Sequence, residues 1–107
     1  MKDDKEKNTI MQFQQTQQQV QILMMQKQNL QIQLNEVENA LEEISKSEGS
    51  EVYQMVGTIM IKKDIEKIKK ELDEKKETVA LRVSVVDKQI EKFNTKLIEL
   101  QKSLKGG

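Results

Sequence analysis

The side chains that most often perform catalysis or bind metals are scarce in this sequence. Histidine and cysteine are both absent, which removes the commonest general base, thiol chemistry, disulfides and the usual zinc ligands. The carboxylates are spread over faces that we expect to be solvated. The five serines have no histidine to activate them, and no glycine-rich phosphate loop is present. We therefore predict that the chain is not an enzyme and binds neither a metal nor a cofactor.

The stretch from Glu51 to Lys62, EVYQMVGTIMIK, organises the rest of the chain. Two short apolar runs, 52–56 and 58–61, are rich in β-branched residues and meet at Gly57. Because glycine adopts a positive φ without steric cost, Gly57 is expected to form the turn of a β-hairpin over about 51–62. The turn reverses the chain, so the segments on either side should lie antiparallel.

The alternation of side chains along a strand predicts that both faces of this hairpin are largely apolar. We expect one face to hold Tyr53, Met55, Ile59 and Ile61, and the other to hold Val52, Val56 and Met60. A lone two-stranded hairpin is marginal in water, and its open edges invite pairing with other strands. The hairpin could fold back on its own helices. We favour assembly with hairpins of other subunits through Val52, Tyr53, Met55, Val56, Gly57, Ile59, Met60 and Ile61.

Long helices are predicted on both sides of the hairpin, over about 9–47 and 64–105. Thr9 fits the N-cap of the first, Gly49 fits a left-handed residue that ends it, and Asp64 fits the N-cap of the second. Apolar residues recur at alternating spacings of 3 and 4, the heptad pattern of a coiled coil. The first seam holds Phe13, Val20, Leu23, Leu30, Leu34, Val37, Leu41 and Ile44. The second holds Ile65, Lys69, Leu72, Lys76, Val79, Val83, Val86, Ile90, Phe93, Leu97, Leu100 and Leu104.

The two seams predict an antiparallel register. If Ile44 lies beside Ile65, Phe13 comes close to Lys96, and glutamates near the end of the first helix face lysines at the start of the second. Lys27 interrupts the first seam. We expect its stem to pack while its ammonium reaches solvent, so that it helps to set the register.

Further apolar residues lie outside the seams or near the chain ends. Six lie off the first seam and suggest an adaptable contact surface: Ile10, Met11, Ile22, Met24, Met25 and Ile32. Seven form what we call the terminal patch: Ile10, Met11, Phe13, Leu97, Ile98, Leu100 and Leu104. Some of these have too little partner surface to be buried. The patch is either a frayed end with a few exposed leucines or a surface that holds something apolar.

Composition restricts the class of partner. The 18 basic and 18 acidic residues cancel, which argues against a nucleic-acid or anionic-membrane binder. The chain is 36% hydrophobic with one Tyr, two Phe and no Trp, which is too little for a globular core and suits helices that bury a stripe. No apolar run approaches a membrane span, and the N-terminal MKDDKEK is no signal peptide. We expect a soluble, cytoplasmic protein.

The order of these motifs resembles the β-type subunit of prefoldin over nearly the whole chain. The resemblance is carried by residues 26–28 (QKQ), 34–36 (LNE), 40–44 (ALEEI) and the hairpin from Val52 to Lys62. The family often has lysine where this chain has Gln54. A single hairpin is typical of β-type subunits, whereas α-type subunits carry two.

The pattern predicts a mainly α fold, a single domain over 1–107 in which one β-hairpin joins a long antiparallel two-helix coiled coil. The resemblance adds a hetero-hexamer of two α-type and four β-type subunits, whose hairpins assemble into a β-barrel body. It also implies an ATP-independent holdase that binds unfolded client proteins at the coiled-coil tips and delivers them to a group II chaperonin. The alternative function is a coiled-coil scaffold or adaptor with one specific protein partner.

Overall fold

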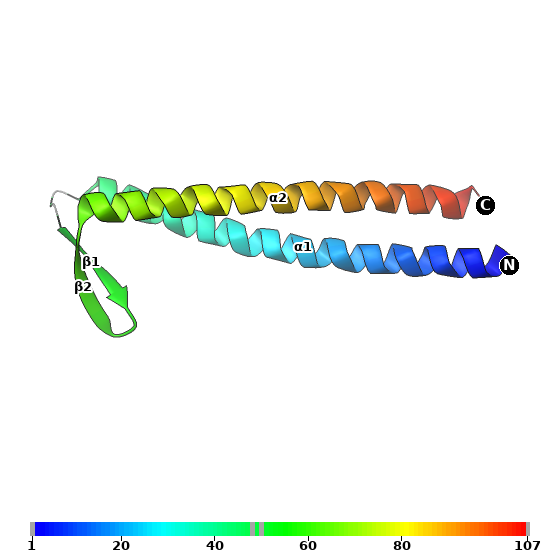
Figure 1. Ribbon diagram of the computed structural model, residues 1–107, viewed down its shortest axis with the longest axis horizontal. Coiled ribbons are helices and arrows are strands. Elements are labelled where there is room, and N and C mark those ends of the chain that lie inside the picture. The colour runs from blue at the N-terminus through cyan, green and yellow to red at the C-terminus, as the bar shows by residue number, and fades with distance from the viewer. Residues whose placement is uncertain (1, 48, 50, 107) are drawn as a thin grey trace. The chain divides into compact units, whose positions relative to one another are not determined.

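The computed structural model describes residues 2–47, 49 and 51–106, with side chains from residue 4 onward. The chain runs through helix α1 (Lys2–Ser45), strand β1 (Glu51–Val56), strand β2 (Ile59–Asp64) and helix α2 (Ile65–Lys105), as Figure 1 shows. The predicted order of helix, hairpin and helix is confirmed. The contacts define two compact units, one of Met1–Asn29 with Val83–Gly107 and one of Leu30–Arg82, and each is described by itself below.

Helix α1 begins before the predicted N-cap. It starts at Lys2, so Thr9 lies inside the helix, where its Oγ1 donates a hydrogen bond to the carbonyl oxygen of Lys5 at 2.8 Å. The prediction of Thr9 as N-cap was wrong because the helix continues through the charged stretch before it, KDDKEKN, whose three lysines and one glutamate favour helix. Acidic residues near a helix start are also stabilised by the helix dipole.

Helix α1 also ends earlier than predicted, at Ser45. The backbone N–H of Ser47 donates to the carbonyl oxygen of Ile44 at 3.1 Å, a three-residue step that tightens the last turn. Gly49 does not end the helix, since in the described part of the chain only Gly57 has a positive φ. The neighbouring positions 48 and 50 lie outside the described residues. Asp64 directly precedes the first residue of α2, as its predicted capping role requires.

The hairpin closes through a two-residue turn, Gly57 and Thr58. Gly57 has a φ of 63°, the left-handed conformation predicted for it. The register pairs Val56 with Ile59 and Met55 with Met60, and paired residues share a face. The predicted faces were therefore wrong. One face carries Tyr53, Met55 and Met60, and the other carries Val52, Gln54, Val56, Ile59 and Ile61. The error arose because the turn type, which sets the register, was not fixed by the sequence pattern.

The unit of Met1–Asn29 and Val83–Gly107 buries a short stretch of both predicted seams. Val20 and Leu23 of α1 and Val86 of α2 are buried, together with Thr16. The Thr16 hydroxyl donates to the carbonyl oxygen of Gln12 at 2.7 Å, so the buried polar atom has a partner within its own helix.

The unit of Leu30–Arg82 buries Val37 of α1 with Ile65, Ile68 and Val79 of α2. Ile68 was not in the predicted seam, which passed through Lys69 instead. Lys69 is half-buried, whereas Lys76 is exposed. Both 65–68–72 and 65–69–72 satisfy spacings of 3 and 4, and the prediction took the second, whereas the structure buries Ile68.

Removal of the two methyl groups of Val37 tests this core. We expect Val37→Ala to lower the free energy of unfolding by about 1–2 kcal/mol, because Val37 is 3% exposed and loses about two buried methyl(ene) groups. Urea unfolding followed by far-UV circular dichroism measures this. Val85→Ala is the matched control, since it makes the same substitution at a helical position, on α2, that is 49% exposed. A Val85→Ala loss as large as that of Val37→Ala would contradict the assigned core.

Candidate assembly hairpin and terminal patch

The hairpin presents its apolar side chains to solvent on both faces. Six side chains are between 40% and 67% exposed: Tyr53, Met55, Val56, Ile59, Met60 and Ile61. Val52 and Lys63, which pair with each other near the base of the hairpin, are half-buried. In the described residues the sheet has two strands, so the outer edges of β1 and β2 have no neighbouring strand. The hairpin thus offers both apolar surface and free backbone edges to a partner.

Two charged contacts lie at the base of the hairpin. Lys62 Nζ lies 2.9 Å from Glu51 Oε2 across the two strands. Lys63 Nζ lies 3.5 Å from Glu71 Oε2, which joins β2 to the second turn of α2. All four side chains are partly exposed, so each pair contributes at most about 1 kcal/mol. Their effect is to orient the base, while the outer part of the hairpin remains free of such contacts in the described residues.

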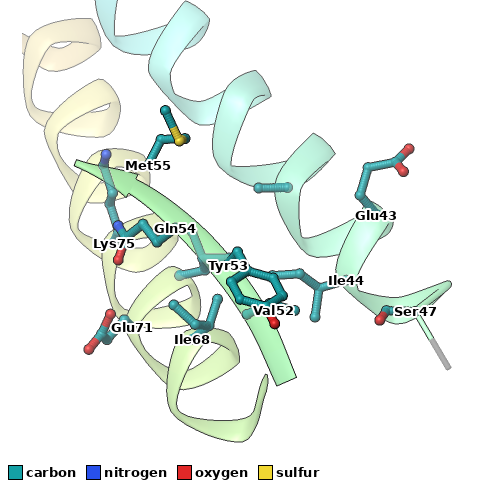
Figure 2. A pocket seen from close by; sticks show the side chains of 12 residues that line it. Glu43, Ile44, Ser47, Val52, Tyr53, Gln54, Met55, Ile68, Glu71 and Lys75 are labelled. Atoms are coloured by element: carbon teal, nitrogen blue, oxygen red, sulfur yellow. The ribbon is translucent and has the colours of Figure 1, made fainter. Parts of the chain in front are cut away.

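A groove of about 720 Å³ lies between β1 and the two helices of the Leu30–Arg82 unit (Figure 2). Its apolar lining includes Ala40 and Ile44 from α1, and Ile68 and Leu72 from α2. β1 contributes Val52, Tyr53, Gln54 and Met55, and the polar lining is Glu43, Ser47, Glu71 and Lys75. No sequence pattern indicated this groove, because it depends on how the hairpin base lies against the helices.

The terminal patch divides into two groups in the unit that contains both chain ends. Ile10, Met11, Ile98 and Leu104 are exposed. Phe13, Leu97 and Leu100 are half-buried at seam positions. The exposed group is therefore available to a partner, whereas the half-buried group also contributes to helix pairing.

The predicted antiparallel register agrees with the contacts in this unit. A small groove of about 150 Å³ is lined by Gln12, Gln15, Thr16 and Gln19 of α1 with Phe93 and Lys96 of α2. Lys27 Nζ lies 2.7 Å from Asp87 Oδ1 on α2, and the Lys27 side chain is 35% exposed. Half-burial of Lys27 agrees with the prediction that its stem packs at the seam, and its ammonium forms an ion pair with Asp87 that was not foreseen.

The predicted charge pairing at the hairpin end of the helices was wrong. Besides the two contacts at the hairpin base, the described residues of the Leu30–Arg82 unit pair Lys46 with Glu42 at the end of α1 and Lys69 with Glu66 within α2. None of their ion pairs within 4 Å joins α1 to α2. The glutamates and lysines of those segments are mostly exposed, so they can turn toward solvent rather than toward each other.

No helix in residues 2–47, 49 and 51–106 is long and apolar enough to cross a membrane. In the same part of the chain, no three His, Cys, Asp or Glu side chains gather in a way that could hold a metal ion.

Comparisons with known proteins place these features in one family. A model of the family described as "Prefoldin subunit" matches residues 7–106. The prefoldin subunit beta of Thermococcus onnurineus is 44% identical over 89 residues, which cover 82% of this chain and 77% of that protein. The prefoldin subunit beta of Archaeoglobus fulgidus is 39% identical over 98 residues, which cover 91% and 84%.

A solved structure shows the same fold. The crystal structure of the prefoldin beta subunit from Thermococcus strain KS-1 matches with a TM-score of 0.88 and 35% identity, over 95% of this chain and 90% of that one. The resemblance carried by the hairpin and the flanking motifs is thereby confirmed. With a family model that matches residues 7–106 and relatives of 39–44% identity, the chain belongs to the prefoldin family.

Proposed function

We propose that this chain is the β-type subunit of a hetero-hexameric prefoldin that holds non-native proteins without ATP. The proposed complex contains two α-type and four β-type subunits, acts in the cytoplasm and delivers its clients to a group II chaperonin. The observation that carries the proposal is the hairpin, which exposes six apolar side chains on two faces of a chain that belongs to the prefoldin family.

The exposed apolar faces and the free strand edges of the hairpin favour assembly. Burial of an isoleucine or valine side chain that is exposed in the single chain contributes about 1.5–3 kcal/mol when it is complete. Ile59 and Ile61 lie on one face, and Met55 and Met60 lie opposite each other on the other. Hairpins of several subunits could bury both faces and pair their free edges at once, which is the arrangement of a closed barrel.

Holding a client requires only binding, so the proposed role involves no catalysis and no cofactor. The terminal patch supplies exposed apolar side chains, and several patches in one complex would act on the same client. Weak contacts then add through effective concentration. A client that folds buries its own apolar surface and loses these contacts, which provides release without ATP.

A coiled-coil scaffold with one specific partner is the competing function. It would use the same seams but leaves the two exposed faces of the hairpin without a role. The two functions differ in their response to unrelated unfolded proteins, because a scaffold would bind one partner to saturation and ignore the rest.

The assembly role predicts the effect of charge on the hairpin. We expect Ile59→Asp combined with Ile61→Asp to abolish co-assembly with a two-hairpin α-type subunit, because two carboxylates would be buried on one face without partners. Native mass spectrometry and light scattering after size-exclusion chromatography measure the assembly. Leu81→Asp with Val85→Asp is the control, since both side chains are exposed on α2 and lie outside the hairpin. A hexamer that persists in the hairpin variant would refute the assembly role.

The holding role predicts that the assembled complex suppresses aggregation. A denatured, aggregation-prone protein is diluted into buffer without ATP, and its light scattering is followed. We expect near-stoichiometric complex to suppress the signal, and a complex with Ile10→Ser, Met11→Ser and Ile98→Ser to require about tenfold more protein, since three exposed apolar contacts are lost. These positions are chosen because Leu97 and Leu100 also pack in the seam.

The control for this experiment is Leu81→Ser, which removes an apolar side chain that is 67% exposed from the other unit. Unimpeded aggregation in the presence of the intact wild-type complex would rule out the holdase and favour the scaffold. Full suppression by the triple-serine complex would show that the terminal patch is not the binding surface.

A further inference from the structure

The first helix carries an outward apolar face that neither the seam nor the hairpin uses. Ile10 and Met11 are 45% and 56% exposed, and Met24 and Met25 are 56% and 66% exposed. All four belong to the same unit. In the heptad pattern Met11 and Met25 lie opposite the seam of Val20 and Leu23, whereas Ile10 and Met24 lie between that side and the seam. The two doublets therefore form solvent-exposed apolar surface that runs from the flank of the seam to the outer side of α1.

The spacing of these doublets aligns them along the helix. Fourteen residues separate Ile10 from Met24 and Met11 from Met25, which is two heptads, so both doublets fall on the same side of a coiled-coil helix. At about 1.5 Å per residue the doublets lie about 21 Å apart. Between them on this side are the exposed side chains of Gln14, Gln17, Gln18 and Gln21.

Charge separates this face from the neighbouring helix. From residue 8 to residue 35, Lys27 is the only charged residue of the sequence, and its Nζ lies 2.7 Å from Asp87 Oδ1. The α2 segment of the same unit carries eight charged residues: Asp87, Lys88, Glu91, Lys92, Lys96, Glu99, Lys102 and Lys105. The outer face of α1 is thus electrically neutral beside a charged helix.

The apolar side chains, the glutamines and the lack of charge on this face favour one kind of binding partner. Thioether side chains adapt to varied apolar shapes, and glutamine amides both donate and accept hydrogen bonds, as the unpaired backbone of an extended peptide requires. A charged segment would lose hydration on this face without gaining a counter-charge. An extended chain rises about 3.3 Å per residue, so about seven residues span the distance between the doublets.

We propose that the outer face of α1, from Ile10 to Met25, binds an uncharged extended segment of a non-native polypeptide, with apolar side chains on the two doublets and its backbone on the glutamines between them. This inference rests on the proposed holding of non-native proteins. It adds to that proposal a second contact at Met24 and Met25, outside the terminal patch, and a selection for segments without charge.

The binding test uses the assembled complex and two fluorescent nine-residue peptides. One peptide is apolar and uncharged, and the other carries two aspartates at its centre. We expect the uncharged peptide to bind at least tenfold more tightly by fluorescence anisotropy, with an affinity that does not fall between 50 and 500 mM salt. In the complex with Met24→Glu and Met25→Glu, we expect binding of the uncharged peptide to weaken about tenfold.

The control places the same two glutamates on the other helix of the unit, where they replace lysines and lower the net charge by four rather than by two. Lys88→Glu with Lys92→Glu changes exposed residues of α2 and is expected to leave binding of the uncharged peptide unchanged. Circular dichroism and native mass spectrometry check that each variant folds and assembles. If both double variants weaken binding equally, or if the Met24 and Met25 variant binds like wild type, the proposal is overturned.

A second measurement locates the client directly and does not depend on charge. Because the sequence has no cysteine, Met25→Cys gives a single attachment site for a photo-crosslinker, and Lys92→Cys gives the matched site on α2. We expect crosslinks from position 25 to a denatured client that exceed those from position 92 several-fold and vanish with the native client. Equal yields at both positions in a complex that still suppresses aggregation would refute this contact while leaving the holdase intact. A wild-type complex that fails to suppress aggregation would instead refute the proposed function.

Discussion

The narrow seam between two antiparallel helices is the interaction on which the rest of the structure depends. In the described residues, the buried apolar side chains are Val20, Leu23, Val37, Ile65, Ile68, Val79 and Val86, and most of the other residues are exposed. A seam buries one side of each helix and leaves no second layer to cover anything else. Most apolar residues outside the seam are therefore exposed, and they form surfaces that a partner can contact.

The hairpin shows the consequence of this constraint most clearly. Its geometry is fixed locally, by the positive φ of Gly57 and by the pairing of Val52 with Lys63 near its base. The stability of the hairpin does not come from these local contacts, since two strands with exposed faces gain little free energy from burial. Conformation is thus specified within the chain, while the favourable free energy of burial is left for a partner. Membership of a family whose relatives are named as subunits agrees with this division.

Much of the fold was predictable because heptad spacing and a glycine turn are periodic or local signals. The seam residues Val20, Leu23, Val37, Val79 and Val86 were identified from spacing alone, and they are buried. Predictions were wrong where the outcome depended on which of two local preferences prevails. Thr9 fits a cap, but the stretch before it continues the helix, and the hairpin faces depended on a turn whose length the pattern did not determine. The groove beside β1 and the Lys27–Asp87 pair arise from tertiary placement and have no sequence signature.

The composition of α1 links its stability to its surface. A helix without charged residues has no ion pairs along its sides, so its helicity must come from the propensity of glutamine, methionine and leucine and from packing against α2. Residues 8–35 follow this pattern, with Lys27 as the one charge and its partner on the opposite helix. Because the seam supplies the stabilisation, the outer side of α1 is free to remain neutral and apolar. Beside this neutral stretch, the charges that favour solubility lie on the facing part of α2, residues 87–105.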